Sequence, residues 1–178
     1  MNNNDIKEIV QNIQTNETSK QTRYAEITQK AQQFFMTQQT TKFVDLYNEK
    51  SFSIREKIDA LYILLLDIIQ TENFDYEKIL KFREKIVKSQ NNNFIYLFDN
   101  AMFQAGVNSP EEFVQSIEEG IKKQIPMAYV IKSFFYYYGL QEYSHSMQAI
   151  EKAILLEPTN LEYKRLRQNL ENEYNGMT

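Results

Sequence analysis

The chain has 178 residues, of which 42% are hydrophobic and 13% aromatic, enough material for one folded domain with a substantial core. Its 24 acidic and 20 basic residues give a formal charge of -4 and are scattered along the sequence, which argues against nucleic acid or an anionic membrane as the main partner. The absence of cysteine excludes disulfide bonds and thiolate metal sites and favours a cytoplasmic location.

The N-terminal segment, residues 1–20, is rich in Asn and Gln and has only a weak apolar stripe between positions 6 and 13. It lacks the apolar core of a secretory signal, so we expect no export by the general route. We therefore predict a polar N-terminal segment over residues 1–20, frayed or docked, and a single helical domain over residues 21–178.

Apolar residues recur at i, i+3 and i+4 through most of the chain, while glycine and proline number only 4 and 3. This pattern predicts an all-α fold. The stretches 22–38 and 40–52 form either a further pair of helices or one long helix, because only a polar Thr/Gln patch separates them. The most apolar stretch, residues 58–69, is too short to cross a bilayer and contains two aspartates, so we expect a buried helix and no membrane insertion.

Helix start signals divide the remainder into segments of similar length. Capping boxes begin at Ser53, Ser109 and Thr159, and Asp75 can cap another helix. The helices expected from these signals cover residues 54–71, 75–89, 93–105, 109–123, 126–139, 142–156 and 159–174.

The helix expected over residues 142–156 has small and large apolar residues at regular spacing. Ser146, Ile150, Ala153 and Pro158 follow Tyr143 in the order small, large apolar, small and proline. This stretch resembles the second helix of a tetratricopeptide repeat, or TPR. A shift of about 33 residues, the usual length of such a repeat, superimposes equivalent residues of the preceding hairpin.

The resemblance covers somewhat over half of the chain and has departures. Phe134 stands where the family normally has a small residue, Gln141 where it often has a turn glycine, and Arg83 at an expected apolar position. The resemblance implies a right-handed superhelix of stacked helical hairpins, about three TPR-like repeats, with extra N-terminal helices and a C-terminal capping helix. A different helical bundle is the alternative.

Five consecutive aromatic residues, 134–138, cannot share one face of a helix, because neighbouring residues are about 100° apart. In a stacked array the first helix of a hairpin is contacted on nearly every side, so all five aromatic side chains could pack against a neighbouring element. We expect Phe134 to pack on the preceding hairpin, Tyr137 on the second helix, and Phe135 and Tyr138 toward the concave groove.

The resemblance also implies a binding module that holds a peptide or a partner's helix in its concave groove. The groove would be mostly apolar, with Asp99 and Lys132 as one facing pair of charges, and it lacks the cluster of basic residues that clamps a carboxylate. The alternative is that the protein's own N-terminal helices bury these residues. The residues expected in the groove are Leu64, Leu65, Ile68, Phe98, Asp99, Met102, Ile131, Lys132, Phe135 and Tyr138.

Signals for catalysis are weak. His145 lies between Ser144 and Ser146, but adjacent helical residues point to different faces and no acid stands at a spacing that would orient the imidazole. The glutamate pairs at 111–112 and 118–119 are explained by a solvated helix face. We expect a protein that is not an enzyme, with no catalytic residues, metal or cofactor.

Two function classes remain open. The first is an adaptor or scaffold subunit of a larger assembly that binds a protein or peptide partner. The second is a client-specific chaperone, because the size, acidity and central helix pairs are similar to the translocator chaperones of type III secretion. Co-purification separates them: a chaperone should return one dominant hydrophobic client, and a scaffold subunit several components of an assembly.

Overall fold

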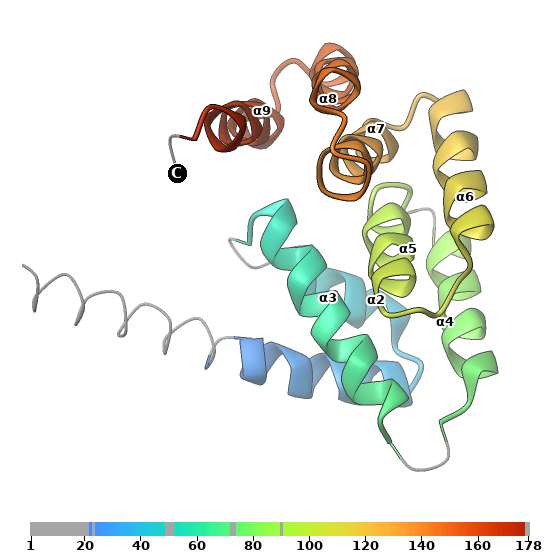
Figure 1. Cartoon of the computed structure of the whole chain (residues 1–178). Coiled ribbons are helices and arrows are strands. Elements are labelled where there is room, and N and C mark those ends of the chain that lie inside the picture. Colours follow the sequence, from blue (N-terminus) through green and yellow to red (C-terminus); the bar gives the residue numbers. More distant parts are fainter. Residues whose placement is uncertain (1–21, 23, 49–51, 72–73, 90, 177–178) are drawn as a thin grey trace, which may run out of the picture.

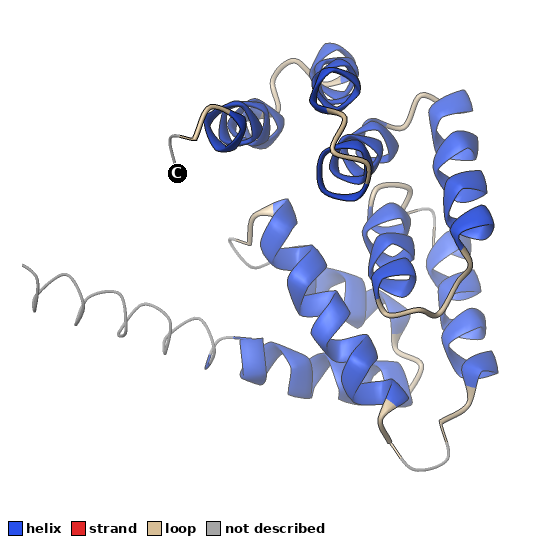
Figure 2. Cartoon of the chain, viewed as in Figure 1, coloured by secondary structure: helices blue, strands red, loops and turns tan. Residues whose placement is uncertain are grey.

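The computed structural model describes residues 22, 24–48, 52–71, 74–89 and 91–176. In this part of the chain every regular element is a helix, which confirms the all-α prediction (Figure 2). No helix among the described residues has the length and apolar character needed to cross a bilayer. The polar segment predicted for residues 1–20 lies outside the described residues.

The helices follow the predicted order closely (Figure 1). The stretch before α2 is a separate helix over residues 24–36, so the N-terminal region forms two helices and not one long helix; Gln38, with φ of 57°, lies in the connection. The elements that follow are α2 (Thr40–Asn48), α3 (Ile54–Ile69), α4 (Tyr76–Lys88), α5 (Phe94–Gln104), α6 (Pro110–Lys122), α7 (Pro126–Phe134), the π-helix η1 (Phe135–Gly139), α8 (Tyr143–Leu156) and α9 (Leu161–Tyr174).

Three of the predicted helix caps are confirmed. The Ser53 and Ser109 side chains each accept a hydrogen bond from the backbone N–H three residues on. The residue there is a glutamate in both cases, and its carboxylate accepts a hydrogen bond from the backbone N–H of the serine. Asp75 accepts a hydrogen bond from the N–H of Glu77 and caps α4. These caps satisfy N–H groups that the first helical turn leaves without a partner, and they fix where α3, α4 and α6 begin.

The capping box predicted at Thr159 is wrong. Asn160 caps α9 instead, and its side chain accepts a hydrogen bond from the N–H of Glu162. The Glu162 carboxylate does not turn back to the cap, because it accepts a hydrogen bond from the backbone N–H of Ile54 at the start of α3. A long-range contact between the last helix and α3 thus replaces a local one.

The pairing of helices differs between the two halves of the fold. From α5 to α9 each helix packs on the next, and α5 also packs on α7. In the first half, α4 packs along α2 and α5 and not along its neighbour α3. Contacts between aromatic rings explain this pairing. Phe35 and Phe43 of the N-terminal helices both contact Phe82 of α4, with ring centroids 4.8 Å apart in each pair. The N-terminal helices thus take the place beside α4 that α3 would hold in a simple hairpin.

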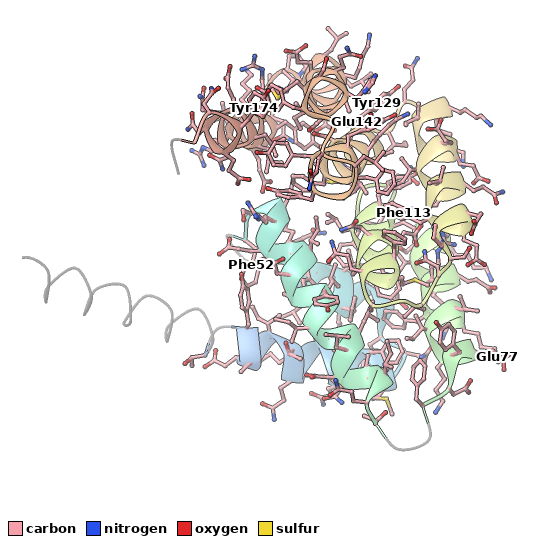
Figure 3. All side chains as sticks on the ribbon, in the orientation of Figure 1. Phe52, Glu77, Phe113, Tyr129, Glu142 and Tyr174 are labelled. Atoms are coloured by element: carbon pink, nitrogen blue, oxygen red, sulfur yellow. The ribbon has the colours of Figure 1, made fainter. Side chains whose placement is uncertain are left out.

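Helix α5 is the centre of the core. Every residue from Phe94 to Met102 is buried, as expected of a helix enclosed on all sides. Phe43 of α2 reaches this helix too, with ring centroids 6.0 Å from Phe94 and 6.2 Å from Phe98. Side chains occupy the space between the ribbons throughout this region (Figure 3). The N-terminal helices therefore belong to the same core as the helices that follow.

Small residues allow the later helices to approach closely. A Cβ added to Gly120 of α6 would lie 2.5 Å from Cζ of Tyr96 and 2.6 Å from Cβ of Ala128, so glycine is required by the crossing of α6 with α5 and α7. Ala153 of α8, the residue that the repeat spacing places in the equivalent position, is fully buried. Gly120 thus has no room for a larger side chain, and the complete burial of Ala153 predicts the same there.

Ala153→Leu is therefore expected to lower the free energy of unfolding by about 1 to 3 kcal/mol through overpacking. Urea denaturation followed by circular dichroism measures this change. Lys152→Leu, at the exposed neighbouring position, is the matched control and should leave the midpoint nearly unchanged. An Ala153→Leu midpoint equal to that of the parent would show that the register assigned to α8 is wrong.

Candidate protein-binding site

Most of the residues predicted for the groove lie inside the fold. Seven of the ten are buried, with at most 5% of their surface exposed: Leu64, Leu65, Ile68, Phe98, Asp99, Met102 and Ile131. Phe98 is covered in part by an N-terminal helix, since Phe43 of α2 packs on it together with Phe82 of α4. Only Lys132, Phe135 and Tyr138 reach the surface, so the predicted residues form no continuous open groove.

The predicted charge pair between Asp99 and Lys132 is not formed. Arg83 of α4 donates two hydrogen bonds to the Asp99 carboxylate, at 2.6 and 2.7 Å, and the Ser116 hydroxyl donates a third. The hydrogen bonding of Arg83 to Asp99 is the main cause of the raised pKa of Arg83. Lys132 lies 2.8 Å from a carboxylate oxygen of Glu118 instead. Asp99 therefore faces α4 and α6, and the arginine that departs from the repeat pattern is its partner.

Phe135 and Lys132 meet in a cleft between α6 and η1, which we name the α6–η1 cleft. Its volume is about 110 Å³. Lys132 and Glu118 close one end as an ion pair, and Val114 and Leu140 stand at the rim with 43% and 48% of their surfaces exposed. The lining residues are Phe113, Val114, Ile117, Glu118, Lys132, Phe135, Tyr136 and Leu140.

The rings of Phe113 and Phe135 form the floor of the α6–η1 cleft, and the ring of Phe103 packs against both of them. Phe113 stacks on Phe103 of α5, with centroids 4.5 Å apart and planes 9° apart, and Figure 3 shows Phe113 on the side of α6 toward α5. Phe135 meets both rings edge-on, with centroids 5.8 Å from Phe113 and 6.3 Å from Phe103. The floor is thus fixed by packing from two successive hairpins, and the rim is open to solvent.

The π-helix η1 shapes the other wall. The sequence predicted one regular helix over residues 126–139, but the Leu140 N–H bonds to the Phe135 carbonyl, five residues back. A π-helix turns less per residue than an α-helix, so Phe135 and Tyr138, expected on one face, point to different sides. Gln141, with φ of 58°, then ends the helix and leaves Leu140 at the rim of the cleft.

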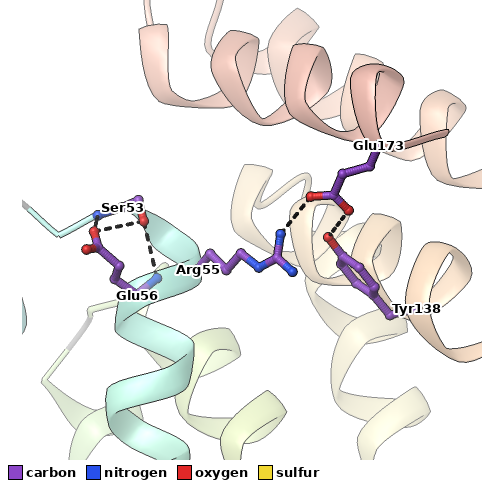
Figure 4. A network of polar contacts seen from close by, with 5 residues as sticks. All are labelled: Ser53, Arg55, Glu56, Tyr138 and Glu173. Carbon is purple, nitrogen blue, oxygen red and sulfur yellow. Dashed lines mark hydrogen bonds and ion pairs between the residues drawn. The ribbon is translucent and has the colours of Figure 1, made fainter. Parts of the chain in front are cut away.

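Tyr138 belongs to a polar network that joins the two ends of the fold (Figure 4). Its hydroxyl donates to a carboxylate oxygen of Glu173 in α9 at 2.8 Å, and Arg55 of α3 lies 2.7 Å from the other oxygen. The Arg55 guanidinium also lies over the Tyr138 ring, 5.1 Å from its centroid. Burial, and then the hydrogen bond to Glu173, raise the pKa of Tyr138. Tyr138 thus links η1 to α9 and α3, and it does not line the α6–η1 cleft.

The two exposed aromatics predicted for the groove should respond differently to truncation. Phe135→Ala removes a ring from the floor and is expected to cost about 1 to 3 kcal/mol of unfolding free energy, below the usual range for a fully buried Phe because this side chain is partly exposed. Tyr138→Phe removes one exposed hydrogen bond and should cost about 1 kcal/mol or less. Parallel urea titrations measure both; a larger loss for Tyr138→Phe would contradict these assignments.

The arrangement around His145 does not form a nucleophile and base. The expectation that no acid stands at a spacing to orient the imidazole is wrong, because the Nδ1 of His145 lies 2.7 Å from a carboxylate oxygen of Glu142, three residues earlier. The Ser146 hydroxyl, in contrast, is buried and hydrogen-bonded to Ser133 at 2.9 Å. Within the described residues, no group of three or more His, Asp or Glu side chains is placed to hold a metal ion.

Sequence reasoning missed the α6 side of the cleft, because the family likeness assigns binding to the first helix of each hairpin. The sequence did contain a signal for exposed apolar residues at this place. Val114 lies outside the buried stripe of Phe113, Ile117 and Gly120 on α6, and Leu140 follows the end of its helix. Comparisons of the chain with protein-family models, with curated proteins and with solved structures find no match. Its function is therefore argued from the residues of this fold.

Proposed function

We propose that this protein is a non-catalytic protein-protein interaction module, an adaptor or scaffold subunit, that holds a partner's peptide or helix at the α6–η1 cleft. The observation that carries the proposal is the cleft itself, with a fixed aromatic floor and an exposed apolar rim formed by Val114 and Leu140. A packed pocket that accepts an apolar side chain and excludes water is typical of the centre of protein interfaces. Lys132 and Phe135 remain in this site from the residues predicted for the groove.

We further propose that α5–α6 and α7–α8 are two stacked TPR-like repeats, capped by α9. The packing of α7 on both α5 and α6, the two helices of the preceding hairpin, supports this arrangement. The small residues Gly120 and Ala153 at equivalent places in the two second helices support it as well. The earlier helices then act as an N-terminal addition that covers the concave side of the first repeat, which moves the partner site to the junction between α6 and η1.

Leu140→Asp tests the site because it places a charge on the rim without entering the core. Leu155→Asp is the matched control, since Leu155 is also an exposed leucine, with 71% of its surface exposed, and lies outside the cleft. We expect Leu140→Asp to reduce partner capture from extracts of the source cells by about tenfold or more, and Leu155→Asp to leave it unchanged. Quantitative mass spectrometry of captured proteins measures this. Equal capture by the two variants would contradict the proposal.

The same capture distinguishes the chaperone alternative. An adaptor or scaffold subunit should retain several components in constant ratio, whereas a client-specific chaperone should retain one dominant hydrophobic client. Neither outcome depends on knowing the partner in advance. In both cases the loss should be specific to Leu140→Asp, because the two functions would use the same cleft.

A further inference from the structure

We infer that the partner segment bound at the α6–η1 cleft offers one apolar side chain with a lysine or arginine within about one helical turn of it. This inference rests on the proposed function, because it names the chemistry of the partner at that same site. Three features carry it: the size of the cleft, the direction in which α6 and α7 run, and the charges at the open end.

The cleft has room for a single side chain. Its volume of about 110 Å³ is bounded below by the rings of Phe113 and Phe135 and at one end by the ion pair of Lys132 with Glu118. Because both charges of that pair are satisfied, this end offers no free charge to a partner. An apolar anchor must therefore enter from the rim, between Val114 and Leu140, and the rest of the segment must lie over that rim.

Helices α6 and α7–η1 run antiparallel, which places the charges along the cleft. Phe113 contacts Phe135 and Glu118 contacts Lys132, so rising residue numbers on α6 meet falling numbers on the opposite wall. The rim at Leu140 consequently lies at the N-terminal end of α6. Lys122, one turn beyond Glu118, stands at the opposite end of the cleft.

Two exposed carboxylates belong to residues close in sequence to the rim residues Val114 and Leu140. Glu111 lies one helical turn before Val114 on the same face of α6, and Glu142 follows Leu140 by two residues. Among the described residues, no lysine or arginine forms an ion pair with either, and the Nδ1 of His145 lies 2.7 Å from a Glu142 carboxylate oxygen. The open end of the cleft is therefore acidic, and a basic residue beside the apolar anchor would complement it, whereas an acidic one would be repelled.

Synthetic peptides test this chemistry directly. The basic probe has one leucine flanked on each side by lysine and alanine; a second peptide has glutamate for each lysine, and a third has alanine for the leucine. Titrations of the full chain, followed by the amide NMR signals of Val114 and Leu140, give the affinities. We expect saturable shifts with the basic probe and about three- to tenfold weaker binding of the other two.

Neutralising the open end should remove the preference for the basic probe. In Glu111→Gln/Glu142→Gln the lysine and glutamate peptides should bind about equally, while Asp45→Asn/Glu84→Gln, which removes the same charge from exposed positions elsewhere, should keep the preference. This control separates a local effect from the overall acidity of the protein.

Each other outcome overturns the inference in a defined way. If the double variant keeps the preference, or if the lysine and glutamate peptides bind the parent equally while the leucine is still required, the basic flank is wrong and the proposed function stands. If no peptide shifts the signals of Val114 and Leu140, the inference is overturned at this site. Loss of the proposed function is recognised separately, by equal partner capture with Leu140→Asp and Leu155→Asp.

Discussion

Phe43→Ala is expected to lower the free energy of unfolding by about 3 to 5 kcal/mol, the range for removing a buried phenylalanine ring. Phe43 is fully buried and its ring contacts those of Phe82, Phe94 and Phe98 on α4 and α5. The truncation would therefore open a cavity where α2 joins two other helices. Urea denaturation monitored by circular dichroism gives the change.

A matched control sits in the preceding helix. Met36 is a large apolar side chain with 61% of its surface exposed, and Met36→Ala should change the unfolding free energy by about 0.5 kcal/mol or less. A loss below about 1 kcal/mol for Phe43→Ala would mean that α2 is not part of the core. The burial of the predicted groove residues behind it would then have to be reconsidered.

Arg83→Ala is expected to cost about 2 to 4 kcal/mol, because it leaves the Asp99 carboxylate buried with only the Ser116 hydroxyl as a side-chain donor. The value lies toward the lower end for a buried pair, since 31% of the Arg83 side chain is exposed. Arg55→Ala, which breaks the more exposed ion pair with Glu173, is the control and should cost about 1 kcal/mol or less.

The double variant Arg83→Met/Asp99→Leu separates the two parts of this effect. Removing both charges leaves no unpaired carboxylate, so its stability should recover toward that of the parent. If Arg83→Ala unfolds at the same urea concentration as Arg55→Ala, the pair contributes no more than a surface contact. The contact between α4 and α5 would then depend on Phe82 and Phe98 alone.

The sequence predicted the helices well because the signals that begin them are local. Ser53, Asp75 and Ser109 cap their helices within a few residues of chain, so no knowledge of distant segments is needed. Thr159 shows the limit of such reasoning. Its box failed because Glu162 found a partner on α3, more than a hundred positions away in sequence, and no local pattern encodes that choice.

The site was harder to predict for the same reason. Periodicity identifies which face of a helix is apolar but not which element covers it, so Phe98 of α5, on which Phe43 of α2 and Phe82 of α4 pack, looked like part of an open groove. Arg83 appeared to be a departure from the repeat pattern, although it pairs with Asp99 on the next helix. The π-helix after Phe134 also has no local sequence signal, and within it Phe135 contacts Phe113 while Tyr138 contacts Glu173.

Site-specific photo-crosslinking tests most directly whether a partner occupies the α6–η1 cleft. The probe is p-benzoylphenylalanine in place of Val114, and the control is the same residue in place of Val87, an exposed valine on α4 with 51% of its surface accessible. Irradiation in the source cells, followed by mass spectrometry, is expected to give a crosslinked partner with the probe at position 114 and none at position 87. Crosslinks of equal yield at both positions, or at position 87 alone, would contradict a binding site in this cleft.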